Sequence, residues 1–374
     1  MMRPFDLSPA DLFNERSVQF RAWGIPPALI KRAQAKIHDC WASGPGGWCH
    51  EWESLALDAE KAEKWLLASA LHAAARFPVP ITDDRKAAML RQIACYERAA
   101  VKFPVPFERK TISVPYRTGH STVTTHLFNP RRASNAAICL SAGVDTQKME
   151  IHRLALALAV GGNFTVAVID MPGTGESKIP LAPDADAIYA GVIDHLRSFY
   201  GASKVGVVAL SFGGMWAAKL SMLGAVDAAV DIGGPVCASP LDGVFISRLP
   251  NGMPGIIANA MGLSEVPSVT EFDHLLSGFM DEMRPLLARR QSSSLLVFNG
   301  DADPYIPRQE IEVFRDFPNA DVWMFKNATH CAPEILPRAI PSVVGWLSEH
   351  LQQKTLRSMI LRGLGGLLLR GDFA

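Results

Sequence analysis

The sequence predicts an α/β protein in which a mostly parallel sheet of eight strands, flanked by helices, follows an N-terminal helical region. From about residue 109, short apolar runs alternate with helix-like stretches, which is typical of strands buried on both faces of a parallel sheet. Before that point, apolar residues recur at three- and four-residue intervals and no strand-like alternation occurs. These two patterns define the fold class.

Residues 1–108 form the predicted N-terminal helical cap domain. We expect its helices in the apolar-periodic stretches 26–43, 58–77 and 82–103, and Thr82 is a suitable N-cap for the last of these. Clusters of proline and glycine separate the stretches. We expect this domain, together with the segment 235–290, to roof the pocket of the catalytic domain.

Residues 109–352 form the predicted catalytic domain. Its first two strands alternate as an antiparallel pair does, and six apolar strands follow. The strands are expected at 110–116, 122–128, 136–143, 164–173, 204–211, 226–234, 293–303 and 320–330, and the helices at 148–160, 187–200, 212–224, 309–317 and 335–352. Within 235–290 the alternation lapses, which predicts a lid-like insertion. Residues 353–374 form a basic amphipathic tail that we expect to pack on the body or on a partner subunit.

The composition argues against several classes of protein. Lys+Arg and Asp+Glu both number 37, so the formal net charge is zero and nothing favours nucleic acid as a partner. The six cysteines are scattered, which indicates reduced thiols in a cytoplasmic protein. The first residues form no apolar stretch of the kind that signals carry, and no apolar run reaches the roughly 18 residues that a membrane span needs. We therefore expect no secretory signal and no stable membrane insertion. Because no metal-ligand spacing or dinucleotide fingerprint occurs, we expect no metal and no cofactor.

The stretch KVGVVALSFGGMWAAKL (204–220) places Ser211 between an apolar strand and a helix. Serine is a common N-cap, which is the simpler interpretation. However, Ala209 and Gly213 are small, as the sharp turn that exposes a nucleophile requires, although the pattern is A-x-S-x-G rather than G-x-S-x-G. The turn also lies at the carboxyl end of a strand and at a helix N-terminus, where ligands and negative charge are favoured. We therefore interpret Ser211 as a nucleophile.

A nucleophilic serine needs a base and a carboxylate that orients the base. Two later strands end in NGDADPYIP and NATHCAP, which supply Asp301, Asp303 and His330 on the same rim as the serine. The chain order Ser, Asp, His is that of α/β-hydrolases. We assign His330 as the base and prefer Asp303 to Asp301 as its partner, because Asp303 lies further into the loop. Asp231 is a weaker alternative for the acid.

Stabilising the oxyanion requires two N–H donors. We assign the backbone of Phe212, directly after the nucleophile, and of Val144, from the loop CLSAGVDTQKME, with Gly143 as the fallback. An enolate leaving group would also need an acid, for which Asp242 is a candidate, the alternative being an ordinary loop residue. The apolar residues of the insertion suggest a bulky apolar substrate, or else they only pack the lid.

These motifs resemble a group of α/β-hydrolases that contains the fermentation-respiration switch esterase-like proteins and dihydroxypseudooxynicotine hydrolase, and they are similar to fungal polyketide-shortening hydrolases. The matching stretches are SAGVDTQKME, IDMPGTGES, LSFGG, NGDADPYIP and NATHCAP, together with the helical stretches before the core. The resemblance implies an α/β-hydrolase fold with a helical cap and a triad of Ser211, His330 and Asp303. It also implies cleavage of an ester, or of a carbon–carbon bond in a β-diketone-like or polyketide-like compound.

The sequence therefore predicts a serine hydrolase that acts through an acyl-enzyme on a small-molecule carbonyl substrate. One alternative is an acyltransferase or cyclase, in which a hydroxyl of the substrate replaces water. Another is a non-catalytic protein of the same fold that binds a ligand or partner. The cap and the tail also suggest a homodimer.

Overall fold

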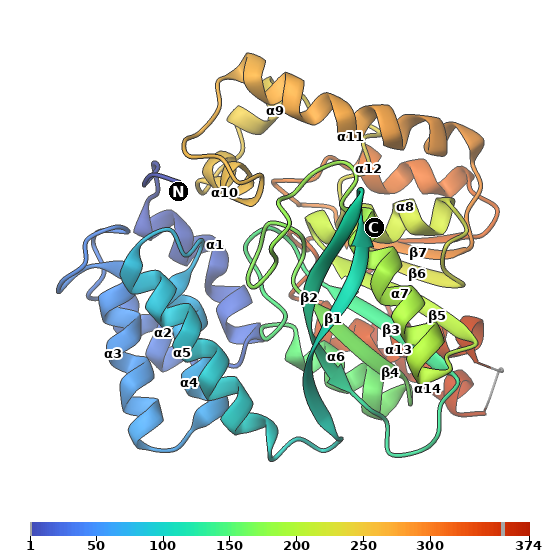
Figure 1. The fold of residues 1–374 in the computed structure, drawn as a ribbon, viewed down its shortest axis with the longest axis horizontal. Coiled ribbons are helices and arrows are strands. Elements are labelled where there is room, and N and C mark those ends of the chain that lie inside the picture. The colour runs from blue at the N-terminus through green and yellow to red at the C-terminus, as the bar shows by residue number, and fades with distance from the viewer. Residues whose placement is uncertain (1, 353–355) are drawn as a thin grey trace.

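The computed structural model describes residues 2–352 and 356–374 (Figure 1). Within these residues, eight strands form one sheet in the order β1-β2-β4-β3-β5-β6-β7-β8. Strand β2 is antiparallel to both β1 and β4, and the strands from β4 to β8 are parallel. The bounds are β1 Phe107–Tyr116, β2 Gly119–Phe128, β3 Ala136–Ser141, β4 Thr165–Ile169, β5 Lys204–Leu210, β6 Ala228–Ile232, β7 Ser294–Gly300 and β8 Ala320–Phe325. The predicted fold class is confirmed.

The central strands are buried on both faces because their side chains alternate between two apolar cores. In β5, Val205 and Val207 belong to the core that includes α7 and α8, whereas Val208 belongs to the core that includes α6 and α13. The helices of this part are α6 His152–Leu156, α7 Asp186–Tyr200, α8 Phe212–Met222, α12 Gln309–Glu312 and α13 Leu336–Leu351. Continuous apolar strands and helices on both faces therefore form the rigid frame of the site.

Two predicted helices of the catalytic domain are shorter than expected, and in the N-terminal domain the expected helix 26–43 ends at Gln34. The stretch 148–160 is helical only from His152, because the preceding residues form a tight loop, and it ends in the π-helical turn Ala157–Gly161. The stretch 309–317 divides into α12 and the 3₁₀ turn Val313–Asp316. The loop that precedes α6, residues 142–151, is called the β3–α6 loop below.

The N-terminal helices lie beside the sheet and have a core of their own (Figure 1). They are α1 Pro9–Ala22, α2 Pro27–Gln34, α3 Trp48–Lys61, α4 Trp65–Arg76 and α5 Asp83–Ala100. The expected single helix 58–77 is wrong, because the chain turns near Glu63, whose φ is +53°, and so separates α3 from α4. Thr82 is at the N-cap position of α5, but its hydroxyl donates to the Asp84 carboxylate instead of accepting from the helix.

The segment after β6 forms an arch of helices at the top of the view in Figure 1, and the tail forms a further helix. The arch consists of α9 Gly243–Ser247, α10 Met253–Ala260 and α11 Val269–Arg289. The tail helix α14, Leu356–Leu368, packs so closely on α13 that a Cβ atom on Gly345 would lie 2.9 Å from the backbone nitrogen of Arg362. None of the helices in the described part of the chain has the length and apolar character that crossing a membrane requires.

Candidate active site

Ser211 lies at the apex of a strained turn between β5 and α8. Its φ and ψ of 54° and −138° are unusual for a residue other than glycine. A Cβ atom on Gly213 would approach the Ala209 Cβ to 3.4 Å and would collide with the backbone oxygen of Ala142, which explains why glycine is required at 213 while alanine is accommodated at 209. The serine side chain makes no capping hydrogen bond to α8. The N-cap interpretation therefore does not account for this hydroxyl.

Three side chains from separate loops meet at this turn. His330, in the loop after β8, has its Nε2 atom 2.9 Å from the Ser211 Oγ. Its Nδ1 atom is 2.7 Å from Oδ2 of Asp303, in the loop after β7. The two other acids considered have different partners: Asp301 accepts from the backbone of Asn327 and Asp231 from the backbone of Gly234.

The Asp303 carboxylate is held by four donors. Oδ1 accepts from the backbone N–H groups of Tyr305 at 2.7 Å and Ile306 at 3.1 Å. Oδ2 accepts from the Asn299 amide at 2.6 Å in addition to His330. Burial alone would raise the pKa of Asp303, but the imidazole and these hydrogen bonds hold it below its ordinary value. The carboxylate thus stays charged. Asn299, to which the sequence alone assigned no role, helps to orient it.

The His330 imidazole is largely covered, with 13% of its side chain exposed, and the ring of Tyr305 meets it edge-on at 5.2 Å between centroids. Burial by itself lowers the pKa of His330, whereas the charge of Asp303 and the hydrogen bond to it raise the pKa above its ordinary value. An imidazole with this carboxylate on one side and a hydroxyl on the other can take up the hydroxyl proton.

The β3–α6 loop approaches the serine closely. A Cβ atom on Gly143 would lie 2.5 Å from the Ser211 Cβ and 2.7 Å from its Oγ, so only glycine fits there. Val144, the next residue, lines the same cavity as Phe212, the first residue of α8. The two backbones chosen from the sequence as anion donors thus lie at one cavity, beside the hydroxyl.

This first cavity is narrow and almost wholly apolar, with a volume of about 50 Å³. Ser211, Tyr305 and His330 lie on its wall, and the arch contributes most of the rest. The arch residues that line it are Leu241, Phe245, Ile246, Leu249, Met253, Ile257, Leu276 and Phe279. Among the described residues, none of the N-terminal helices lines this first cavity, so here the insertion alone forms the expected roof.

Asp242 does not line the first cavity and does not serve as a pocket acid. Its carboxylate accepts from the backbone N–H of Phe245 at 2.7 Å and so caps the start of α9. The sequence D-G-V-F places the aspartate three residues before that donor, which is the usual N-cap spacing.

The sequence profile of the Esterase FrsA-like family matches residues 41–352. The chain belongs to this family. It is a hydrolase of the α/β-hydrolase superfamily. Among curated relatives, Esterase FrsA of Vibrio vulnificus (strain YJ016) is 24% identical over 329 residues, which are 82% of this chain and 77% of the relative. Esterase FrsA of Yersinia enterocolitica is 25% identical over 338 residues, with the same two shares of 82% and 77%.

Two solved structures share the fold of this FrsA-like chain. AbyA5 is 20% identical, with a TM-score of 0.78 and coverage of 96% of this chain and 98% of AbyA5. The 2,6-dihydroxy-pseudo-oxynicotine hydrolase is 18% identical, with a TM-score of 0.70 and coverage of 96% and 97%. Because these likenesses extend over nearly the whole chain, the N-terminal helices belong to the shared fold.

The N-terminal helices of the FrsA-like chain contact the β3–α6 loop, which approaches Ser211. Arg16 of α1 is buried and forms an ion pair at 3.1 Å with Asp145, the residue after Val144. Arg76 of α4 donates to the backbone oxygen of Asp145 at 3.2 Å and pairs with Glu150. Two buried guanidinium groups therefore hold the β3–α6 loop, and sequence reasoning did not anticipate either of them.

The acid loop is tied to the same helices through Tyr305. The phenol of Tyr305 donates to the Glu15 carboxylate, accepts from Asn251 of the arch at 3.0 Å, and faces the Arg16 guanidinium. Tyr305 follows Asp303 by two residues, so this network joins α1, the arch and the loop that holds the acid.

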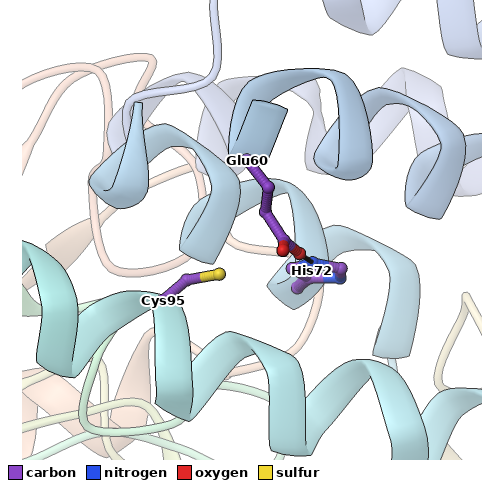
Figure 2. Close-up of side chains that lie close together, drawn as sticks. All are labelled: Glu60, His72 and Cys95. Carbon is purple, nitrogen blue, oxygen red and sulfur yellow. Dashed lines mark hydrogen bonds and ion pairs between the residues drawn. The ribbon is translucent and has the colours of Figure 1, made fainter. Parts of the chain in front are cut away.

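Within the described residues, one group of three side chains combines ligand types that metals use: Glu60, His72 and Cys95, from α3, α4 and α5 (Figure 2). Figure 2 shows the three pointing toward one another. The His72 Nε2 and Glu60 Oε1 atoms are 2.6 Å apart, a hydrogen-bond distance, whereas two ligands of a tetrahedral zinc ion lie about 3.3 Å apart. Arg91 also contacts the Glu60 Oε1, at 3.3 Å. We therefore interpret the group as a hydrogen-bonded pair beside a thiol and assign no metal to it.

Proposed function

We propose that this FrsA-like chain is a serine esterase that works through an acyl-enzyme on Ser211. The observation that supports this most strongly is the unbroken hydrogen-bonded series from Ser211 to His330 at 2.9 Å and from His330 to Asp303 at 2.7 Å. In this proposal Ser211 is the nucleophile, His330 the general base and Asp303 the group that orients the imidazole and stabilises its cation.

The reaction begins when His330 takes the proton of Ser211 and the Oγ atom attacks the ester carbonyl. The carbonyl oxygen becomes an anion, which accepts hydrogen bonds from the N–H groups of Val144 and Phe212. A donor of this kind accounts for about 3–4 kcal/mol of transition-state stabilisation. The carbon–oxygen bond then breaks and His330 gives its proton to the departing alkoxide. Water, deprotonated by His330, attacks the acyl carbon. The bond to the Ser211 Oγ then breaks, His330 returns its proton to that oxygen, and the acid is released.

The first cavity favours an ester over a carbon–carbon bond. An enolate leaving group needs a donor or an acid close to the serine, and Asp242, the candidate for that task, caps α9 instead. Tyr305, which lies in the cavity wall, already donates its hydroxyl hydrogen to Glu15 and so cannot donate it to an enolate. Cleavage of a polyketide-like or β-diketone-like carbon–carbon bond therefore receives no support from this wall, and a carboxylic ester is the substrate that we propose.

The apolar wall also indicates which part of the ester enters the first cavity. A volume of about 50 Å³ admits a slender alkyl chain, and a bulky acyl group enters only when the arch moves away from the serine. We propose a short or linear aliphatic acyl group. In this scheme residues 109–352 form the catalytic domain, in which residues 235–290 act as the lid. Residues 1–108 form a cap that supports the β3–α6 loop, and residues 353–374 form the tail.

The proposal is tested by reaction with a fluorophosphonate probe and by hydrolysis of p-nitrophenyl butyrate. We expect the native protein to be labelled once per chain, and Ser211→Ala to lose both labelling and hydrolysis. The matched control is Ser203→Ala, which removes an exposed hydroxyl at the start of β5 and should react like the native protein. Labelling that persists in Ser211→Ala contradicts the proposal.

Hydrolysis and acyl transfer share the first half of this mechanism, and so does cyclisation. Mass spectrometry of the product formed in ¹⁸O-labelled water separates them, because one labelled oxygen enters the acid only when water is the acceptor. We expect the label in the acid. The homodimer and the cytoplasmic location stay predictions.

A further inference from the structure

A second cavity of about 390 Å³ shares Val144 with the first as a lining residue. Val144 lines both cavities, so the second begins where the proposed anion donor stands. Its wall comes from four segments: the linker after α4, the β3–α6 loop, the loop after β4 and the end of α10. The second cavity is thus larger than the first and lies next to the reacting centre.

Three polar side chains in this wall have hydrogen-bonding atoms for which the structure shows no partner. Gln147 is only 2% exposed, and its Oε1 atom has no hydrogen-bond partner, although its amide nitrogen contacts the Met89 sulfur at 3.3 Å. Within the described part of the chain, the side chains of Asn259 and Lys178 make no hydrogen bond or ion pair. They stand in different segments, Lys178 after β4 and Asn259 in α10.

The other polar groups of the same wall have partners. Arg76 donates to Gln92 and Asp145 and pairs with Glu150, and Thr174 donates to the backbone of Met171. A buried polar atom without a partner destabilises a protein by about 1–3 kcal/mol. The free acceptor at Gln147 is therefore a cost to the fold. Its Oε1 atom is covered in this structure, so a ligand's hydroxyl group would remove that cost once the side chain turns toward the cavity.

On the basis of the proposed esterase function, we propose that the second cavity holds the leaving group of the substrate, and that this group is a hydroxyl-bearing alcohol. An ester carbonyl bound at Val144 and Phe212 has two substituents. The apolar acyl chain occupies the first cavity, so the alkoxy substituent extends past Val144 into the second. There, Gln147 accepts from a hydroxyl, the Asn259 amide both donates and accepts, and the Lys178 ammonium donates to an oxygen near the mouth.

The chemistry of the step is unchanged by this assignment. The bond between the Ser211 Oγ and the acyl carbon forms first. The ester carbon–oxygen bond breaks when the oxyanion collapses, and the proton on His330 passes to the alkoxide. The alcohol is released into the second cavity, which leaves the acyl-enzyme open to water.

The test compares two esters of the same acid, glyceryl monobutyrate and propyl butyrate, which differ only in the hydroxyl groups of the alcohol. We expect kcat/KM for the glyceryl ester to exceed that for the propyl ester by about tenfold or more, the value of one or two hydrogen bonds. Gln147→Leu and Asn259→Leu should each lower this ratio by about tenfold. Leu249→Ala, on the wall of the first cavity, should alter the preference for acyl length and leave the ratio unchanged.

Three results would overturn the assignment. A native ratio near one, in a protein that still reacts with fluorophosphonate, refutes the second-cavity proposal and leaves the esterase proposal intact. Equal loss of activity on both esters in Asn259→Leu also refutes the second-cavity proposal. Asn259 is partly exposed, so this substitution carries little risk of misfolding. If the two variants instead discriminate between propyl glycerate and propyl butyrate, the second cavity holds the acyl group. Absence of both labelling and hydrolysis refutes the esterase function itself.

Discussion

Replacing Asp303 by asparagine should invert the proton pattern of the proposed triad. The Oδ1 atom accepts from two backbone N–H groups, those of Tyr305 and Ile306, so the carbonyl oxygen of the new amide must take this place. Its NH₂ group then occupies the place of Oδ2, facing the Asn299 amide and the Nδ1 atom of His330. Since an NH₂ group is a donor, it favours the imidazole tautomer with its hydrogen on Nε2. That tautomer cannot accept the proton of the serine.

A serine protease in which the same substitution produces the wrong tautomer loses about 10⁴-fold in kcat, and we expect a loss of that order here. A factor of 10⁴ corresponds to about 5 kcal/mol in the barrier. The assay is kcat/KM for p-nitrophenyl butyrate, with thermal unfolding to show that the variant is folded. The control is Asp301→Asn, in the same loop, whose carboxylate accepts from Asn327 and does not contact the histidine. We expect the control to keep at least about one third of the native activity.

The residual activity of Asp303→Asn should also shift with pH. The base must be neutral to act, so kcat/KM of the native protein rises with pH until His330 has lost its proton. Because the charge of Asp303 raises the pKa of His330, removing that charge moves the rising limb to lower pH. Two results would refute this role of Asp303: an Asp303→Asn variant that keeps more than about a tenth of the native activity, or a rising limb of its pH profile that does not move. A larger loss in Asp231→Asn would identify the other acid as the partner.

Three further predictions test the surroundings of the serine. Burial raises the pKa of Asp231 to about 7, so folding stability should fall as the pH rises from about 4 to 7, and Asp231→Asn should remove up to about 4 kcal/mol of this dependence in urea titrations. Gly143→Ala, which adds a methyl group 2.7 Å from the Ser211 Oγ, should slow fluorophosphonate labelling by at least about 100-fold; Gly119→Ala, with open space around it, should have no effect. Arg16→Met strands a buried carboxylate and should reduce the free energy of unfolding by about 3 kcal/mol, part of which a second substitution, Asp145→Asn, restores.

The sequence predicted the sheet and the three converging side chains for a simple physical reason. Parallel strands all end at one edge of a sheet, so residues that follow apolar runs must lie on the same rim, however far apart they are in the chain. Ser211, Asp303 and His330 each follow such a run, after β5, β7 and β8. The small neighbours of the serine added a local steric requirement, which Gly213 meets.

One of the two elements that were not predicted in the N-terminal domain has a recognisable signal in the sequence, and the other has none. Helix α1 was overlooked, although Ser8 followed by Pro9 is a recognisable helix start: the serine hydroxyl accepts from the backbone of Asp11 at 3.3 Å. The turn at Glu63 carries no proline or glycine, so the periodicity of 58–77 passed through it unbroken. The missed start was readable, whereas the missed turn depends on the packing of α3 and α4.

The contacts of Arg16 could not be predicted, because they join residues far apart in the chain and depend on how two layers pack. Arg16 is 129 positions from Asp145 and 289 positions from Tyr305. The cap and the arch are both rich in apolar residues, so composition could not decide which of them lines the first cavity. In the structure the arch does so, while α1 and α4 hold the backbone beside Val144. A substitution in the arch should therefore change which acyl chains bind and appear mainly in KM. A substitution at Arg16 displaces the anion donor for every substrate, and should therefore lower kcat whatever the acyl chain.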